Sequence, residues 1–327
     1  MTTRGQATAA ASGLLPVQPV PACRQPGAGI RSPGTALVRA RAVAALVPGL
    51  FKLRIGAVIA FTALAGLAVT PGRGVAWWEI TLLGLSVLIA SAAAGAFNQY
   101  YEADLDRRMR RTRGRPFATG ALRAGPGWLA LIMLMVGGAV VATALALNLD
   151  AAFYVFLGAF FYAVVYTVWL KRRTWLNIVV GGAAGSFAVL AGAAAVTPQL
   201  DAIAIVFAAM LFLWTPSHFW CLAIACREDY AAAGVPMLPV LIGNARTARV
   251  ILSNTVALVA TSLTPLAFGM GWIYAVGAAS GGAFFLARNL ALVRHPDRAS
   301  AMRCFHASLA QLTLVLASAM LDRTIAG

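Results

Sequence analysis

The sequence predicts an all-α polytopic membrane protein with about nine transmembrane helices. Of its 327 residues, 61% are hydrophobic and only 11% are charged, which is an apolar fraction well above that of a soluble domain. Apolar runs of about twenty residues, the helix length that a bilayer core requires, recur from Ala57 to Leu321. Because backbone groups cannot stay unpaired in lipid, each run is expected to be helical.

Nine apolar segments alternate with short segments that carry nearly all of the charge. The predicted helices cover residues 53–70, 79–101, 124–148, 151–170, 175–197, 200–225, 247–269, 272–293 and 301–321. With the N-terminus in the cytoplasm, every Lys and Arg except Arg73 and Arg323 falls on the cytoplasmic side, which is the asymmetry typical of membrane proteins. The net charge of +16 therefore follows the topology and does not indicate a nucleic-acid-binding surface.

The first 45 residues differ from the rest of the chain. They are rich in Ala, Arg, Gly and Pro, contain no acid, and lack the compact apolar stretch of a secretory signal. We expect a disordered tail at 1–45 and one membrane domain over 46–327. An Arg-rich, acid-free start is also typical of a mitochondrial transit peptide. The location is therefore either a bacterial inner membrane, which the compact length favours, or the mitochondrial inner membrane.

Half of the ten acidic residues gather at two places, both at predicted cytoplasmic helix ends. Glu102, Asp104 and Asp106 follow the second predicted helix, and Glu228 and Asp229 follow the sixth. Two acidic clusters at the same end of a helical bundle can face each other across a cavity. A charged cluster in such a place is a candidate functional site.

The first cluster continues a polar stripe that begins within the helix. Asn98, Glu102 and Asp106 are four residues apart and so share one helix face. Their oxygen atoms suit Mg²⁺, which also binds phosphate oxygens. Asp104 points elsewhere on a continuous helix and is expected to pair with nearby arginines. The alternative is a solvated helix end whose acids only neutralise the arginines that follow.

Two further segments combine aromatic and ionisable residues. In the fourth predicted helix, Lys171 follows Tyr166 by five residues, and its ammonium can either contact a diphosphate or simply anchor the helix end. In the sixth, His218 lies among large aromatic residues, which indicates either a pocket for a large flat ligand or an ordinary buried histidine. On a continuous helix, His218 and Asp229 would differ by only about 20° around the axis. Pro216 is expected to kink this helix.

Four blocks of the sequence resemble the motifs of UbiA-type intramembrane prenyltransferases, in the form found in the heme O synthase branch. They are Asn98-x-x-x-Glu102-x-Asp104-Leu105-Asp106-x-x-Met109-x-Arg111-Thr112-x-x-Arg115-Pro116, Tyr166-Thr167-x-x-Leu170-Lys171-Arg172-x-Thr174-x-x-Asn177, Trp214-Thr215-Pro216-x-His218-Phe219-Trp220 and Asp229-Tyr230-x-x-Ala233-Gly234-Val235-Pro236-Met237-Leu238-Pro239. The first block indicates only the superfamily, whereas the last two are specific to the heme branch. The resemblance covers residues 45–320.

This resemblance implies a fold, a reaction and a set of partners. The fold is a bundle around a central cavity open to the cytoplasmic face. The reaction transfers a farnesyl group from farnesyl diphosphate to the vinyl group of heme B, giving heme O and diphosphate, a step in heme A biosynthesis. Mg²⁺ is the implied cofactor, the lipid bilayer surrounds the protein, and a downstream heme O oxygenase (heme A synthase) is a candidate partner.

The resemblance also assigns roles to individual residues. The implied catalytic residues are Asn98, Glu102, Asp106, Lys171 and Asp229. The implied Mg²⁺ ligands are Asn98, Glu102, Asp106, Glu228 and Asp229. The implied substrate-binding residues are Arg111, Arg115, Tyr166, His218, Trp214 and Trp220. His218 could ligate the heme iron or form a hydrogen bond with a propionate, and the sequence does not separate these roles.

Three departures from the family pattern limit the comparison. Glu102 stands where the family usually has Asp, and Ser217 replaces a second proline before the histidine. The second acidic motif is reduced to Glu228 and Asp229. Two other functions therefore remain open: a prenyltransferase acting on a quinone or chlorophyll-type precursor, and a transporter or scaffold with incidental acids.

Overall fold

Helices make up the whole regular structure of the residues described here. The computed structural model describes residue 46 and residues 48–326, and no strand occurs among them. These residues belong to one unit, Ala45–Gly327. The tail predicted at 1–45 lies outside the described residues.

The apolar segments form long helices and the charged segments form short ones. The long segments are α2 (Leu53–Val69), α3 (Trp77–Tyr101), α6 (Pro126–Ala146), α7 (Leu149–Phe160) with the π-helix η1 (Phe161–Leu170), α8 (Asn177–Gly181) with α9 (Ala183–Val196), α10 (Ala202–Ala225), α13 (Asn244–Leu263) with the 3₁₀-helix η2 (Thr264–Phe268), α14 (Trp272–Arg294) and α15 (Arg298–Ala326). The short helices are α4 (Ala103–Arg108), α5 (Pro116–Thr119), α11 (Arg227–Ala232) and α12 (Leu238–Ile242).

Length and composition support the predicted membrane architecture. In the part of the chain that the structure describes, 8 helical segments are long and apolar enough to cross a bilayer, and α2 is a shorter apolar helix of 17 residues. Each of the nine predicted segments overlaps one of these helices. The all-α membrane fold is therefore confirmed, and the count of nine spans stays a prediction because α2 is short.

Several helices begin at residues that satisfy free backbone groups. The Asn148 side chain accepts a hydrogen bond from the Ala151 amide at the start of α7, and Asp201 does the same for Ala204 at the start of α10. Such caps satisfy amides that have no partner within the helix. Pro126 occupies the first position of α6, where the missing N–H has no cost.

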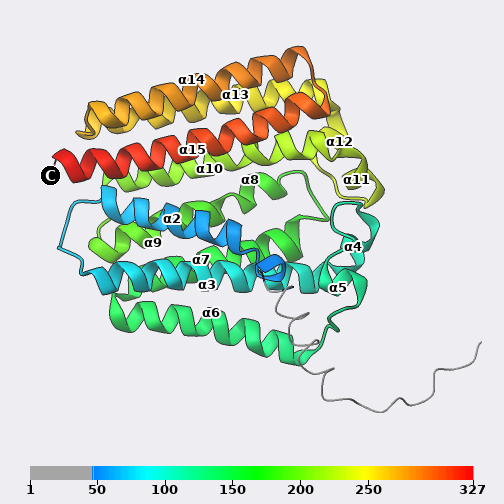
Figure 1. The fold of residues 1–327 in the computed structure, drawn as a ribbon, viewed down its shortest axis with the longest axis horizontal. Coiled ribbons are helices and arrows are strands. Elements are labelled where there is room, and N and C mark those ends of the chain that lie inside the picture. Colours follow the sequence, from blue (N-terminus) through cyan, green and yellow to red (C-terminus); the bar gives the residue numbers. More distant parts are fainter. Residues whose placement is uncertain (1–45, 47, 327) are drawn as a thin grey trace, which may run out of the picture. The chain divides into compact units, whose positions relative to one another are not determined.

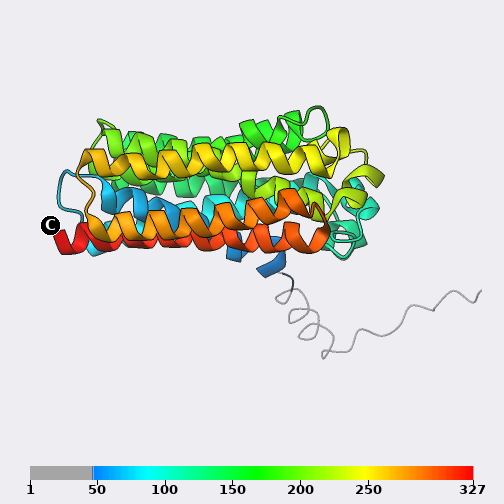
Figure 2. The same cartoon turned by 90° about the horizontal axis from the view of Figure 1, so that it is seen from above.

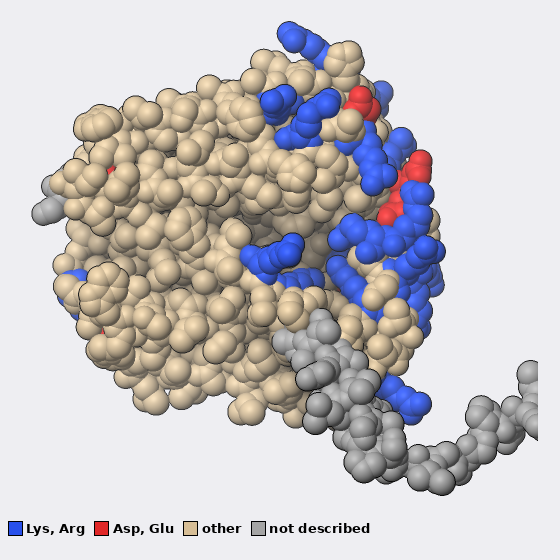
Figure 3. Space-filling model, in the orientation of Figure 1, with Lys and Arg blue, Asp and Glu red and all other residues tan. Residues whose placement is uncertain are grey.

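The long helices run side by side, and the charged groups gather at one end of the bundle. Two perpendicular views show the shared helix direction (Figures 1 and 2). Most Lys, Arg, Asp and Glu side chains in view lie at the end that carries α4, α5, α11 and α12 (Figure 3). The surface in that view is also hollowed near its middle, with Lys and Arg side chains at the edge of the hollow. Which membrane face this end occupies stays a prediction.

Small residues allow α2 and α9 to pack closely in the centre of the bundle. A Cβ atom added at Gly192 would lie 1.9 Å from the Ala63 carbonyl oxygen, and one at Gly66 would lie 2.3 Å from the Val189 carbonyl oxygen. In a membrane, close packing replaces the hydrophobic effect as the force that joins helices. The two glycines therefore set the spacing between α2 and α9.

We expect Gly192→Ala to lower the free energy of unfolding by about 1–3 kcal/mol. The added methyl group would meet backbone, not a flexible side chain, so α2 and α9 would have to separate. Thermal unfolding of the purified protein measures the effect. The matched control is Gly138→Ala in α6, where nothing lies within 4 Å of the added carbon. Equal melting temperatures for both variants would contradict the close contact.

Candidate active site

The polar stripe predicted on the second long helix is buried at the charged end of the bundle. Asn98 lies in α3, Glu102 at the junction of α3 and α4, and Asp106 in α4. The amides of Glu102 and Asp106 donate to the carbonyl groups four residues before them, so the three side chains keep a helical spacing across the junction. Their exposed fractions are 2%, 0% and 2%.

Each member of the stripe contacts a cation from a different segment. Lys52 Nζ donates to Asn98 Oδ1 at 2.7 Å, and Lys171 Nζ donates to Glu102 Oε2. Arg115 Nη1 lies 2.9 Å from both carboxylate oxygens of Asp106. The stripe therefore forms one face of an array in which one amide and two carboxylates each contact a cation, and the cations come from before α2, after η1 and before α5.

Lys52 belongs to this array, although its position in the sequence predicts no role beyond membrane topology. Its backbone is left-handed (φ 48°, ψ 42°), a conformation that is uncommon outside glycine and often marks a functional constraint. Its ammonium also donates to the Tyr162 hydroxyl at 2.9 Å. Burial and the nearby cations Arg115 and Lys171 lower the pKa of Lys52 to about 7. A Lys directly before an apolar span was the only signal available.

The π-helix η1 explains how Tyr166 and Lys171 come to lie together. The Lys171 amide donates to the Tyr166 carbonyl five residues earlier, which is the π-helical spacing and often marks a functional site. Lys171 Nζ lies 5.6 Å from the centre of the Tyr166 ring. The Tyr162 and Tyr166 rings stack 5.6 Å apart, so aromatic faces line the wall beside the two lysines.

Glu102 retains a free oxygen that fits a metal ion. Its Oε1 atom is buried without a hydrogen-bond partner, and a buried acceptor in this state is costly unless a ligand binds it. Within the described residues, no three His, Cys, Asp or Glu side chains come close enough to hold a metal alone. Mg²⁺ commonly uses one or two carboxylates together with substrate phosphates, and the carboxylates of Glu102 and Asp106 meet that requirement.

The second acidic cluster contacts the loop that follows α4. Asp229 accepts hydrogen bonds from Arg110 Nε at 2.9 Å and from the Arg111 amide at 3.3 Å. Burial alone would raise the pKa of Asp229, but these hydrogen bonds hold it below its usual value. Because Asp106 in α4 and Arg115 before α5 flank the loop that carries Arg110 and Arg111, the contacts connect Asp229 to the first cluster.

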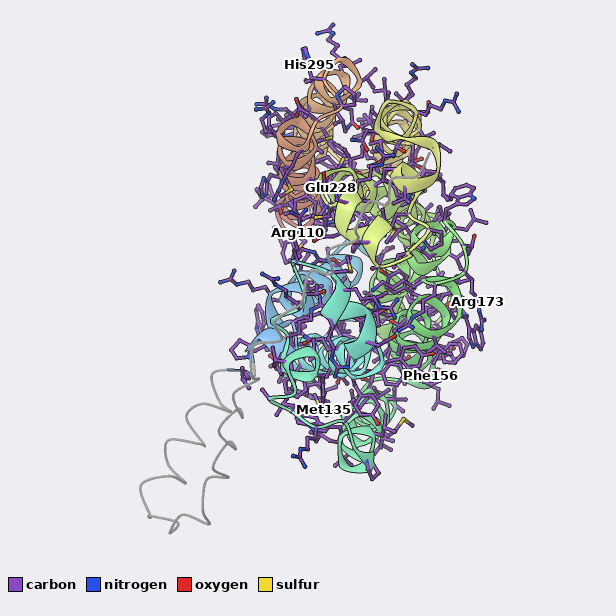
Figure 4. The ribbon with its side chains drawn as sticks, turned by 90° about the vertical axis from the view of Figure 1, so that its right-hand side faces the viewer. Arg110, Met135, Phe156, Arg173, Glu228 and His295 are labelled. Carbon is purple, nitrogen blue, oxygen red and sulfur yellow. The ribbon has the colours of Figure 1, made fainter. Side chains whose placement is uncertain are left out.

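Glu228 differs from its neighbour Asp229 because it points outward. Its side chain is 86% exposed, against 10% for Asp229, and it pairs with Arg110 at 2.8 Å. Figure 4 shows Arg110 and Glu228 near each other at this end of the bundle. Neighbouring residues on a helix differ by about 100° in direction, which explains why only Asp229 turns inward.

Asp104 faces away from the buried stripe, as the helical spacing predicted. Both of its carboxylate oxygens pair with Arg172, at 2.7 and 2.9 Å. This hydrogen-bonded arginine lowers the pKa of the Asp104 carboxyl. The pair lies at the exposed edge of the charged end, outside the array formed by the stripe and its cations.

His218 lies in a stack of aromatic rings between α10 and α15. The Trp214 and Phe305 rings each lie 4.2 Å from the imidazole, at interplanar angles of 16° and 28°. Ser308 Oγ lies 2.7 Å from His218 Nδ1, and Trp214 Nε1 donates to the Ser308 carbonyl at 2.9 Å. The histidine is therefore held by two residues of the last helix, Phe305 and Ser308, which no sequence pattern marks as functional.

One expectation about the sixth span needs correction. α10 ends at Ala225 and α11 starts at Arg227 after a break at Cys226 (φ −115°, ψ 24°), so the 20° offset expected between His218 and Asp229 on one continuous helix does not apply. Trp220 does not join the His218 stack: its ring lies 6.5 Å from that of Trp175, and its Nε1 is buried without a partner.

Ser217 stabilises the region around Pro216. Pro216 lies inside α10 and has no N–H to give the helix. Asn254 Nδ2 on α13 donates to the Leu213 carbonyl at 2.6 Å and to Ser217 Oγ at 2.8 Å. The serine hydroxyl also lies 2.9 Å from Thr255 Oγ1. A serine in place of proline thus connects the His218 segment to α13.

Comparison with known proteins identifies close relatives. Residues 59–314 match the model of the UbiA prenyltransferase family. Protoheme IX farnesyltransferase 2 of Paramagnetospirillum magneticum is 52% identical over 282 residues, covering 86% of this chain and 98% of that protein. Protoheme IX farnesyltransferase 1 of the same organism is 48% identical over 275 residues, covering 84% of this chain and 96% of that protein.

A solved structure shares the fold. The structure of a UbiA homolog from Archaeoglobus fulgidus bound to GPP and Mg²⁺ aligns with a TM-score of 0.60 and 16% sequence identity. The alignment covers 82% of this chain and 98% of that chain. At this level of identity, the likeness concerns the arrangement of helices alone.

Proposed function

Because the chain belongs to the UbiA prenyltransferase family, we propose that it transfers a farnesyl group from farnesyl diphosphate to the vinyl group of heme B. The products are heme O and diphosphate, and water supplies the new hydroxyl group. The names of the relatives at 52% and 48% identity support heme as the acceptor. In the reaction, the bond between farnesyl C1 and the diphosphate oxygen breaks, and a carbon–carbon bond to the vinyl group forms.

The array of buried acids and cations carries this proposal. Asn98, Glu102 and Asp106 are faced by Lys52, Lys171 and Arg115 at one end of an apolar bundle. Burying this many ionisable groups is expensive unless their charges serve a ligand. A metal diphosphate presents the matching pattern, because its metal suits the carboxylates and its oxygen atoms suit the cations.

Mg²⁺ would be held by Glu102 and Asp106 with the Asn98 amide oxygen. Among the described residues, Asp229 lies too far away to complete a three-carboxylate site, and it would act from the facing segment by holding the loop that carries Arg110 and Arg111. When bound, the metal neutralises the leaving diphosphate. The unpartnered oxygen of Glu102 supports this assignment. Glu228 contributes through Arg110, which it shares with Asp229.

The cations of the array would then contact the diphosphate oxygens. Lys171, Arg115 and Lys52 each pair with the stripe and are positioned to turn toward an anionic ligand. Arg111 adds a charge from the loop between α4 and α5. Preorganised cations of this kind stabilise charge that develops on the leaving group, so the C–O bond can ionise without a protein nucleophile. The aromatic face of Tyr166 adjoins the carbon skeleton.

The heme would bind at the aromatic stack on α10. His218, held in a stack with Trp214, supplies one nitrogen as a ligand or hydrogen-bond partner, whereas Trp220 projects from the opposite face of the helix and is not part of this surface. Both substrates are lipophilic, and the hollow on the side of the bundle (Figure 3) is a suitable place for them to enter from the bilayer.

We assign the protein to a bacterial inner membrane as a multi-pass protein with a cytoplasmic N-terminus. This orientation follows from the distribution of Lys and Arg along the chain. Heme O leaves the enzyme as the substrate of an oxygenase, and heme A synthase is the partner that this order of reactions suggests.

A product assay tests the proposed function. The purified protein, supplied with farnesyl diphosphate, Mg²⁺ and heme B, should release diphosphate and form a heme whose mass has increased by one farnesyl group and one hydroxyl group, the second proton of the water leaving with the diphosphate. Parallel reactions with 4-hydroxybenzoate test the quinone-precursor alternative and should yield no prenylated product. Prenylated 4-hydroxybenzoate without heme O would replace the proposal with that alternative, and no diphosphate release in any reaction would favour a carrier.

A further inference from the structure

The hydrogen bonds around His218 form a chain with a single possible direction. His218 Nδ1 lies 2.7 Å from Ser308 Oγ, and Ser308 Oγ lies 2.7 Å from the Phe305 carbonyl oxygen. A hydroxyl group has one proton and a carbonyl has none. The contact with Phe305 therefore requires Ser308 to donate, and its oxygen accepts the proton of His218 Nδ1.

This direction determines which imidazole nitrogen is free. In the part of the chain that the structure describes, the groups in contact with His218 are aromatic rings and a hydroxyl, and no carboxylate pairs with it. A cationic imidazole in such a place would be an uncompensated buried charge. The neutral ring carries its proton on Nδ1, so Nε2 presents a lone pair.

The surrounding residues hold the ring in one orientation. Trp214 and Phe305 stack on its two faces, and Trp214 Nε1 donates to the Ser308 carbonyl. Two hydrogen bonds with α10, one from Trp214 Nε1 and one with His218 Nδ1, thus hold the turn of α15 that contains Ser308. Histidines that ligate metals commonly donate their second nitrogen to such a fixed acceptor.

We propose that Nε2 of His218 is an axial ligand of the iron of the heme substrate, and that Ser308 is the positioning residue that sets its tautomer. This inference rests on the proposed function, since it requires heme B as the acceptor. A propionate is the weaker partner because an ionised carboxylate only accepts hydrogen bonds, and Nε2 has no proton to donate. Iron accepts the lone pair that this tautomer presents.

Binding of two porphyrins separates iron ligation from propionate contact. Ferric heme B and metal-free protoporphyrin IX carry the same propionates, so we compare their affinities for the full-length protein in lipid nanodiscs. His218→Ala should lower heme affinity at least about tenfold, abolish the absorbance and EPR signature of imidazole ligation, and leave the affinity for protoporphyrin IX unchanged. Added imidazole should restore the signature.

The matched control is His295→Ala, which removes an exposed histidine just after α14 and should change neither affinity. An equal loss of affinity for both porphyrins in His218→Ala would overturn the inference, and so would an imidazole signature that persists in this variant. Heme O synthesis by the wild type would still support the proposed function. Failure of the wild type to bind heme at all would contradict both.

A second variant tests Ser308 separately. Ser308→Ala should keep the iron–histidine bond but shift its stretching band in the resonance Raman spectrum of ferrous heme to lower frequency, because Nδ1–H loses its acceptor. Ser280→Ala is the control, since that serine bonds to its own helix on an exposed face of α14. An unchanged band in Ser308→Ala would remove the positioning role.

Discussion

Replacing Asp106 with alanine is expected to lower the rate of farnesyl transfer by at least about 10²-fold, while the protein still inserts and folds. The carboxylate is 2% exposed, and both of its oxygens hold Arg115. Its loss removes a proposed Mg²⁺ ligand and the group that orients one proposed diphosphate contact. Folding should persist because Asp106 lies in α4, outside the long apolar helices, and the Arg115 side chain reaches water.

The control for this prediction is two residues away. Asp104→Ala removes an acid from the same short helix, but one that is 51% exposed and paired outside the array with Arg172. We expect its rate to match the wild type. Diphosphate release and heme O formation measure the rate, and the yield from membranes with the melting temperature measures folding. A wild-type rate in Asp106→Ala, or an equal loss in both variants, would contradict the assigned role.

Hydropathy predicted the helices well because lipid permits few alternatives to an apolar helix. Changes of helix type and interruptions within these helices were not predictable from hydropathy. The helix expected at 151–170 changes from α to π at Phe161, and the one expected at 175–197 is interrupted between α8 and α9 at Gly182. These changes depend on which backbone carbonyl accepts the hydrogen bond of each amide, and an apolar pattern contains no information on that pairing.

The acids of the candidate site were found from sequence because acidic residues are rare in this chain, so each one is conspicuous. Their partners were less visible. Lys52 was counted among the basic residues that orient the N-terminus, and its contact with Asn98 depends on one left-handed residue and a separation of 46 positions. Ser308 lies in an apolar helix, and its role follows from its contact with His218 of α10, which the sequence does not show.

In the second acidic cluster, the direction of α11 determines which acidic side chain faces the site. The sequence suggested Glu228 and Asp229 together as metal ligands, whereas only Asp229 is buried beside the loop after α4. The break at Cys226 sets the direction of α11, and hence which acid turns inward. A helix break of this kind depends on contacts with the loop after α4, which lies more than a hundred residues earlier.

The buried pair Lys171–Glu102 offers a prediction in which stability and activity change differently. Glu102 has no exposed surface and Lys171 is 8% exposed, so Lys171→Met leaves a buried carboxylate without its cation. Removing one partner of a buried ion pair costs about 3–5 kcal/mol. We expect this single variant to lose that much unfolding free energy and to lose farnesyl transfer as well.

The double variant Glu102→Gln/Lys171→Met should recover the stability and not the activity. Removing both charges leaves no uncompensated ion, and replacing a buried pair by neutral residues is often close to neutral in stability. Farnesyl transfer should stay absent because the proposed metal ligand and the diphosphate contact are both gone. Arg172→Met is the control, since an exposed pair contributes about 0–1 kcal/mol. Wild-type turnover by the double variant would show that the pair only stabilises the bundle, and full stability of the single variant would show that Glu102 does not depend on Lys171.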